Sequence, residues 1–117
     1  MDALEIRQRI CKHRFRYTSE GQLQDALEKL FISLELVFER EVRLNAADRP
    51  DFMIGSIAVE VKTKGSRSAA IAQMQRYAEH DRVSEIILVT SRAVHLDMPA
   101  ELRGKPVHVA HLLAGAF

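Results

Sequence analysis

Three ionisable side chains stand among apolar residues in the middle of the sequence. Asp51 opens one short apolar run, and Glu60 and Lys62 lie two residues apart in the next run. Because side chains alternate across a strand, Glu60 and Lys62 are expected on the same face of a sheet. If the two runs pair through a turn at Gly55-Ser56, Asp51 comes near Glu60. Two carboxylates and an ammonium group are costly to bury on an apolar sheet, and a divalent cation is the usual partner.

The spacing of these residues resembles the signature of a nuclease superfamily. Pro50-Asp51 followed by Glu60-Val61-Lys62 is similar to the motif of the PD-(D/E)xK superfamily. The resemblance implies hydrolysis of DNA phosphodiester bonds. It further implies that Asp51, Glu60 and the backbone carbonyl of Val61 bind Mg²⁺ or Mn²⁺, for which oxygen ligands are suited. Lys62 is then expected to orient the attacking water or to stabilise charge on the phosphate.

Two helical segments add polar groups that the superfamily also uses. Glu20 lies on the apolar stripe of a helix expected over residues 19–34, where it can add a third carboxylate to the site. Gln73 and Tyr77, four residues apart on a helix expected over residues 67–80, resemble the glutamine–apolar–x–x–tyrosine motif of the exonuclease and helicase-nuclease branch. That resemblance implies that Gln73 contacts the scissile phosphate or a water at the metal, with Tyr77 in support.

Each of these residues also has a purely structural interpretation. Asp51, Glu60 and Lys62 can form a salt-bridge cluster, and Glu20 can simply be an acid stabilised by a helix N-terminus. Tyr77 can be an ordinary packing residue.

Positive charge is concentrated near the start of the chain, although the formal net charge is only +1. Five cations stand against two acids in residues 1–19, and a basic segment of this kind suits phosphates. A solvated helix face is the alternative. The residues that we expect to contact DNA are Arg14, Arg16, Arg49, Lys64, Arg67, Arg76 and Tyr77.

Length and composition indicate one soluble domain spanning residues 1–117. Hydrophobic residues make up 47% and charged residues 28% of the chain, as in ordinary globular proteins. No apolar run approaches the roughly 20 residues needed to cross a membrane. The single cysteine, Cys11, fits a reducing cytoplasm. We expect a cytoplasmic protein of a bacterial host cell, of phage origin, with no membrane association and no nucleotide cofactor.

The expected elements follow the order αβββαβ, with a further C-terminal edge strand. They are helices over residues 2–15, 19–34 and 67–80, and strands over residues 35–44, 51–54, 57–63, 86–89 and 107–109. This is a mixed α/β layer. The resemblance, which covers roughly residues 18–92, implies a restriction-endonuclease-like core in which a four-stranded mixed sheet is flanked by helices.

The function expected from these features is that of a metal-dependent deoxyribonuclease. Size and element order look most like small phage or archaeal Holliday-junction-resolvase-like enzymes, so cleavage of junctions or flaps is expected. A homodimer is expected to form through residues 107–109 or the tail around Leu112. The alternative from another class is a phage-derived module that binds DNA or protein without hydrolysis. Cleavage of RNA also remains open.

Overall fold

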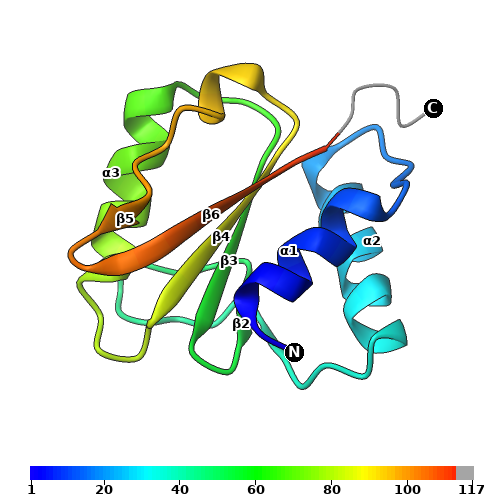
Figure 1. Cartoon of the computed structure of the whole chain (residues 1–117), viewed down its shortest axis with the longest axis horizontal. Coiled ribbons are helices and arrows are strands. Elements are labelled where there is room, and N and C mark those ends of the chain that lie inside the picture. The colour runs from blue at the N-terminus through cyan, green and yellow to red at the C-terminus, as the bar shows by residue number, and fades with distance from the viewer. Residues whose placement is uncertain (113–117) are drawn as a thin grey trace.

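The chain folds into three α-helices and a mixed sheet, shown in Figure 1. The structure, a computed structural model, describes residues 1–112. The α/β class expected from the sequence is confirmed, but the sheet of the described residues has six strands and not four. The elements are α1 (Ala3–Lys12), α2 (Glu20–Ser33), β1 (Glu39–Arg40), β2 (Phe52–Ile54), β3 (Ile57–Lys62), α3 (Arg67–Ala78), β4 (Glu85–Thr90), the 3₁₀ helix η1 (Ala93–His95), β5 (Glu101–Leu102) and β6 (Lys105–His111).

The strands run in the spatial order β1-β2-β3-β4-β6-β5. The first three pair antiparallel, β3, β4 and β6 pair parallel, and β5 pairs antiparallel with β6. The hairpin between β2 and β3 turns at Gly55, whose positive φ of 59° suits glycine. Because β3 and β4 are parallel, the chain must cross over between them, and α3 forms that crossover.

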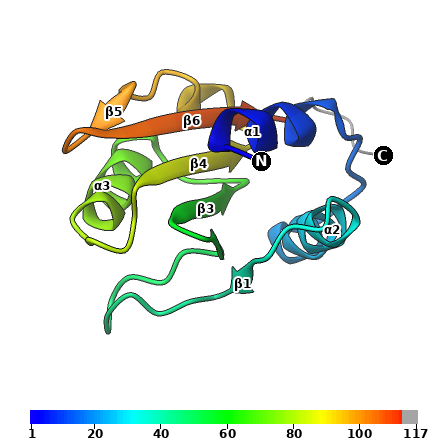
Figure 2. The same cartoon turned by 60° about the horizontal axis from the view of Figure 1, so that its bottom comes forward.

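The helices divide between the two faces of the sheet. Figure 2 shows α3 on one face, with α1 and α2 on the other. The side chains of β3 alternate accordingly: Val59 and Val61 pack in the core beneath α1 and α2, whereas Ala58 packs beneath α3. Glu60 and Lys62 follow the alternation of Ala58 and therefore belong to the α3 face. The sequence thus places the two ionisable residues of β3 under a single helix.

Serine side chains cap the two helices that border the site. Ser19 accepts a hydrogen bond from the backbone N–H of Gln22 at the start of α2, and Ser66 accepts one from Ala69 at the start of α3. The Gln22 side chain accepts a hydrogen bond from the backbone N–H of Thr18, so the start of α2 lacks the reciprocal bond of a full capping box.

Two expectations about the strands are wrong. The strand expected over residues 35–44 is limited to β1, because Glu35 and Glu41 have positive φ values of 57° and 55° that interrupt the extended chain on both sides. The strand expected over residues 107–109 exists as β6. It is not an edge strand, because β5 pairs with its first residues and forms the edge of the sheet. The alternation of polar and apolar residues did not predict the left-handed backbone conformation of Glu35 and Glu41.

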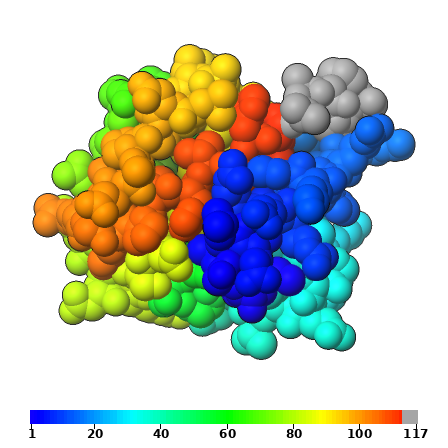
Figure 3. Space-filling view, in the orientation of Figure 1, coloured from blue at the N-terminus to red at the C-terminus, as the bar shows by residue number. Residues whose placement is uncertain are grey.

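Helix α1 packs against β6, and Figure 3 shows the surfaces of the two elements side by side. The Arg7 Nε donates a hydrogen bond of 2.6 Å to the backbone carbonyl of Val109. The interface expected at residues 107–109 is therefore partly covered by the chain itself. The expected alternative, the tail around Leu112, lies mostly outside the described residues. In residues 1–112 no helix is both long enough and apolar enough to cross a membrane.

Candidate active site

Asp51 directly precedes β2 and is held by two elements. The register that pairs Phe52 with Val59 puts Asp51 opposite Glu60 when it is continued by one residue. The Asp51 Oδ2 accepts a hydrogen bond of 2.8 Å from the backbone N–H of Val61, and Oδ1 accepts one of 3.0 Å from Gln24 of α2. Burial, joined by the charge of Glu20, raises the pKa of Asp51 above its ordinary value, against the lowering effect of the Val61 N–H.

Glu60 is the more deeply buried of the two acids, with only 5% of its surface exposed. Its Oε2 lies 3.2 Å from the Lys62 Nζ, and its Oε1 accepts a hydrogen bond of 2.8 Å from the Tyr77 hydroxyl. Burial, followed by the charge of Asp51, raises the pKa of Glu60 to about 7 despite the nearby ammonium group. The single positive charge of Lys62 therefore does not offset the effects of burial and of Asp51 on the Glu60 carboxylate.

Gln73 and Tyr77 form a short chain of hydrogen bonds that ends on Glu60. The Gln73 Nε2 donates to the Tyr77 hydroxyl over 3.0 Å, and that hydroxyl donates to Glu60. Burial, followed by the charge of Glu60, raises the pKa of Tyr77, so its hydroxyl keeps the proton that it donates. In this arrangement Gln73 supports Tyr77, the reverse of the order of support expected from the sequence.

Glu20 lies at the start of α2 and reaches toward the end of β3. Its Oε1 accepts hydrogen bonds from the backbone N–H and the hydroxyl of Thr63, over 3.0 and 3.2 Å. The expected convergence of three acids around one ion is not seen: no group of three or more acid, histidine or cysteine side chains in residues 1–112 is arranged to hold a metal ion. Asp51 and Glu60 form a pair, and Glu20 influences it through the pKa of Asp51.

The chemistry of the donor set nevertheless fits a hard divalent cation. Asp51 lies opposite Glu60 when the β2–β3 register is continued by one residue, and the charge of Asp51 contributes to the raised pKa of Glu60. A cation between two such groups would relieve their repulsion, and oxygen ligands are those that Mg²⁺ and Mn²⁺ prefer. Val61, the expected third ligand, lies between Glu60 and Lys62 with its side chain buried on the opposite face.

A pocket of about 390 Å³ opens beside Lys62, the ion-pair partner of Glu60, although neither carboxylate lines it. Three cationic side chains and one amide border it, over a lining of small residues from the first turns of α3. These four polar residues are Lys62, Lys64, Gln73 and Arg76. Three residues expected at the DNA interface therefore gather at the site: Lys64, Arg76 and Tyr77.

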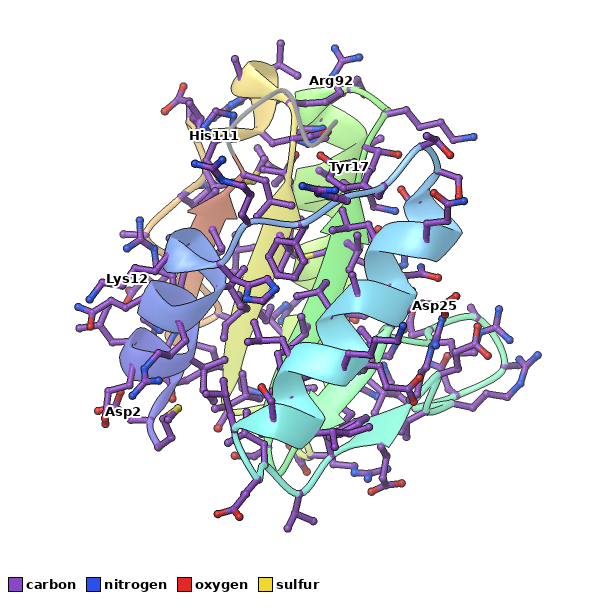
Figure 4. The ribbon with its side chains drawn as sticks, turned by 90° about the vertical axis from the view of Figure 1, so that its right-hand side faces the viewer. Asp2, Lys12, Tyr17, Asp25, Arg92 and His111 are labelled. Atoms are coloured by element: carbon purple, nitrogen blue, oxygen red, sulfur yellow. The ribbon has the colours of Figure 1, made fainter. Side chains whose placement is uncertain are left out.

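The other expected DNA contacts lie elsewhere on the surface. Arg67 pairs with Asp97, with 3.6 Å between the Arg67 terminal nitrogen and Oδ2. Arg14, Arg16 and Arg49 are exposed, and the first two belong to the linker between α1 and α2. In Figure 4, Tyr17, the next residue of that linker, lies toward the same end of the sheet as Arg92 and His111. Because Lys62 pairs with Thr90 in the β3–β4 register, the carboxylate site is at that end too.

Three residues that the sequence did not single out contribute to the site. Gln24 was detectable, because it follows Glu20 by four residues and so shares its helix face. Thr63 directly follows the motif, but nothing in its type indicates that it binds Glu20. Asp48 is buried in the loop before β2, and no periodic pattern predicts the burial of a loop acid.

Comparison of the chain with protein-family models, curated proteins and solved structures gives no match. The functional argument therefore depends on the residues of the site and their geometry.

Proposed function

We propose that this protein is a metal-dependent deoxyribonuclease with a restriction-endonuclease-like core. The observation that carries the proposal is the β2–β3 register, which puts Asp51 opposite Glu60 one residue beyond the last pair, with the Lys62 ammonium 3.2 Å from Glu60. A buried glutamate, a half-buried aspartate and a lysine, arranged by strand register, match the chemistry implied by the PD-(D/E)xK resemblance. A purely structural ion-pair cluster explains less well why a second carboxylate is kept beside a glutamate whose pKa is about 7.

Each polar residue has a definite part in this proposal. Asp51 and Glu60 would hold Mg²⁺ or Mn²⁺, and the ion when bound supplies neutralisation of the charge that develops on the phosphate. Lys62 adds a positive charge on the same face. Tyr77 fixes one oxygen of Glu60 by donating its hydrogen bond, and Gln73 fixes the Tyr77 hydroxyl.

DNA is the substrate that the surrounding charges favour. The pocket at Lys62 has three cations on its border, and a strand that runs across them would neutralise them with its phosphates. We further propose that the enzyme acts on junctions or flaps in the cytoplasm of a bacterial host, as expected for a phage-derived resolvase-like protein. A small chain has little surface to grip a duplex, so a homodimer with one site for each strand is part of this proposal.

A second candidate function is favoured by one observation. Residues 1–112 hold no three-ligand group for a metal ion, and Glu20 is engaged with Thr63. A module that binds DNA through its cations and does not hydrolyse it would also have this arrangement.

One experiment separates the two functions. The protein is incubated with linear, circular, flapped and four-way DNA, and with RNA of matched sequence, with and without Mn²⁺. We expect metal-dependent cleavage of DNA by the native protein and its loss in Asp51→Asn and in Glu60→Gln. Asp25→Asn is the matched control, because Asp25 is an exposed acid of α2 that pairs with Arg40. Binding of DNA without cleavage, or cleavage that survives both substitutions, would reject the proposed active site.

A further inference from the structure

Asp48 is a buried carboxylate for which the proposed chemistry has no use. It is only 4% exposed and lies in the loop between β1 and β2. Three side chains surround it: the Arg76 Nε at 3.1 Å from Oδ1, and the His80 Nε2 at 2.9 Å and the Asn45 Nδ2 at 3.2 Å from Oδ2. The hydrogen bond from His80, together with the one from Arg76, lowers the pKa of Asp48, so it is ionised near neutral pH.

The contact with Arg76 uses only one part of the guanidinium group. Asp48 accepts from Nε, and within residues 1–112 the two terminal nitrogens of Arg76 make no hydrogen bond or ion pair. The same arginine side chain borders the pocket that Lys62 and Gln73 also border. A buried anion therefore fixes the inner edge of the guanidinium, while the outer edge remains available to a ligand with oxygen acceptors.

We propose that the pocket between Lys62, Lys64, Gln73 and Arg76 is a binding site for a backbone phosphate of DNA, and that Asp48 is the positioning residue that orients Arg76 toward it. The inference rests on the proposed function and deepens it, because it locates a phosphate beside Lys62, the ion-pair partner of Glu60. Three cations and an amide donor around a pocket of this size suit a phosphate group, and the guanidinium can donate to two phosphate oxygens at once.

The substitution Asp48→Asn tests this role because charge and geometry predict opposite results. It raises the formal net charge of the protein by one unit, from +1, so long-range attraction alone would tighten DNA binding. If Asp48 positions Arg76, binding weakens in spite of the added charge. We expect a loss of about threefold to tenfold in affinity and a decrease of about 0.9 in the salt slope, as for one lost phosphate contact.

Arg76→Ala provides a second measurement that does not depend on a buried substitution, because the Arg76 side chain is half-exposed. It should weaken binding by a similar factor. In the double variant, Asp48→Asn should add less than about twofold, since both changes remove the same contact. Arg82→Ala is the matched control, because Arg82 is a half-exposed arginine that pairs with Glu39 and does not border the pocket.

Affinity is measured by fluorescence anisotropy with a labelled 20-nucleotide duplex in EDTA, over a series of salt concentrations. Cleavage is measured separately with Mn²⁺, where we expect KM to rise and kcat to stay within about twofold for Asp48→Asn. Tighter or unchanged binding by Asp48→Asn, or additive losses in the double variant, would overturn the inference, as would native protein that binds no duplex at low salt. Native protein that binds in the expected pattern but never cleaves would support the pocket and reject the hydrolase.

Discussion

Replacing Glu60 by glutamine is expected to stabilise the folded protein at alkaline pH while removing its proposed activity. Glutamine keeps the shape of the side chain and an oxygen that accepts the hydrogen bond from Tyr77. It removes the charge that burial and the neighbouring Asp51 disfavour. The charge of Glu60 lowers the free energy of unfolding. Such a destabilising charge is expected in a functional site, because the chemistry needs it although the fold does not.

The size of this effect follows from the pKa of Glu60. A rise from 4.5 to about 7 in the folded protein corresponds to about 3 kcal/mol, at about 1.4 kcal/mol for each tenfold change in proton affinity. Between these pH values the folded protein holds a proton that the unfolded chain releases. The free energy of unfolding therefore falls as pH rises through this window, and the full penalty is present above about pH 7.

Urea unfolding of the two proteins at pH 5 and at pH 8, in EDTA, measures the penalty. The chain has no tryptophan, so the transition is followed by far-ultraviolet circular dichroism. We expect Glu60→Gln to be within about 1 kcal/mol of the native protein at pH 5 and about 2–3 kcal/mol more stable at pH 8. Only the change in this difference with pH isolates Glu60 from the other titrating groups.

Glu79→Gln is the control for this measurement. Glu79 is an exposed acid that directly follows α3 and pairs with Arg103 at the surface, so its removal should change stability by less than about 1 kcal/mol at both pH values. A stability difference between native protein and Glu60→Gln that is the same at pH 5 and pH 8 would show that the site does not disfavour the glutamate charge. The argument for a cation between the two carboxylates would then lose its basis.

Three further predictions concern other parts of the site and its surroundings. Lys62→Ala should lower the rate of DNA cleavage by about 10²–10³, as for loss of one group that stabilises charge, and an unchanged single-turnover rate would remove Lys62 from the chemistry. Replacing Arg14 and Arg16 together by alanine should reduce the salt slope of DNA binding by about one or two phosphate contacts, and an identical slope would show that this linker does not touch DNA. Because the hydrogen bonds from His80 and Arg76 lower the pKa of Asp48 in the folded protein, its ion pairs stabilise the fold above the ordinary pKa of an aspartate and are lost as pH falls through the lowered one. The stability lead of native protein over Asp48→Asn should therefore shrink on acidification below about pH 4, and a lead that grows there would contradict the lowered pKa.

Local patterns were sufficient to predict the hairpin and the helices around the site. Gly55 supplies the positive φ that a two-residue turn needs, and the alternation of apolar and charged residues in β3 fixes which face Glu60 occupies. The position of Asp51 opposite Glu60 follows from that turn, because turn length sets the register of a hairpin. Ser19 and Ser66 mark helix starts through their own side-chain oxygens, which is equally local information.

The remaining features depend on contacts between segments that are far apart in the sequence, and local sequence patterns do not predict such contacts. Glu20 lies on the expected stripe of α2, yet its carboxylate binds Thr63, which is 43 residues away. The buried Asp48 contacts Arg76 of α3 and His80, which follows that helix, and these residues are 28 and 32 positions away in the sequence. The six-stranded sheet likewise includes β5, which pairs with β6, and the sequence predicted only the strand over residues 107–109 in this segment.

The polar groups of the site are held in place from several elements before any ligand is bound. Gln24 of α2 and the backbone of β3 hold the two oxygens of Asp51, and Tyr77 of α3 holds one oxygen of Glu60. A cation that binds this pair would be stabilised without much rearrangement, and by mass action it would stabilise the fold in return. Mg²⁺ or Mn²⁺ should therefore raise the melting temperature of native protein at pH 8 but not that of Glu60→Gln. Equal shifts for both proteins would place the ion elsewhere, even if nuclease activity were found.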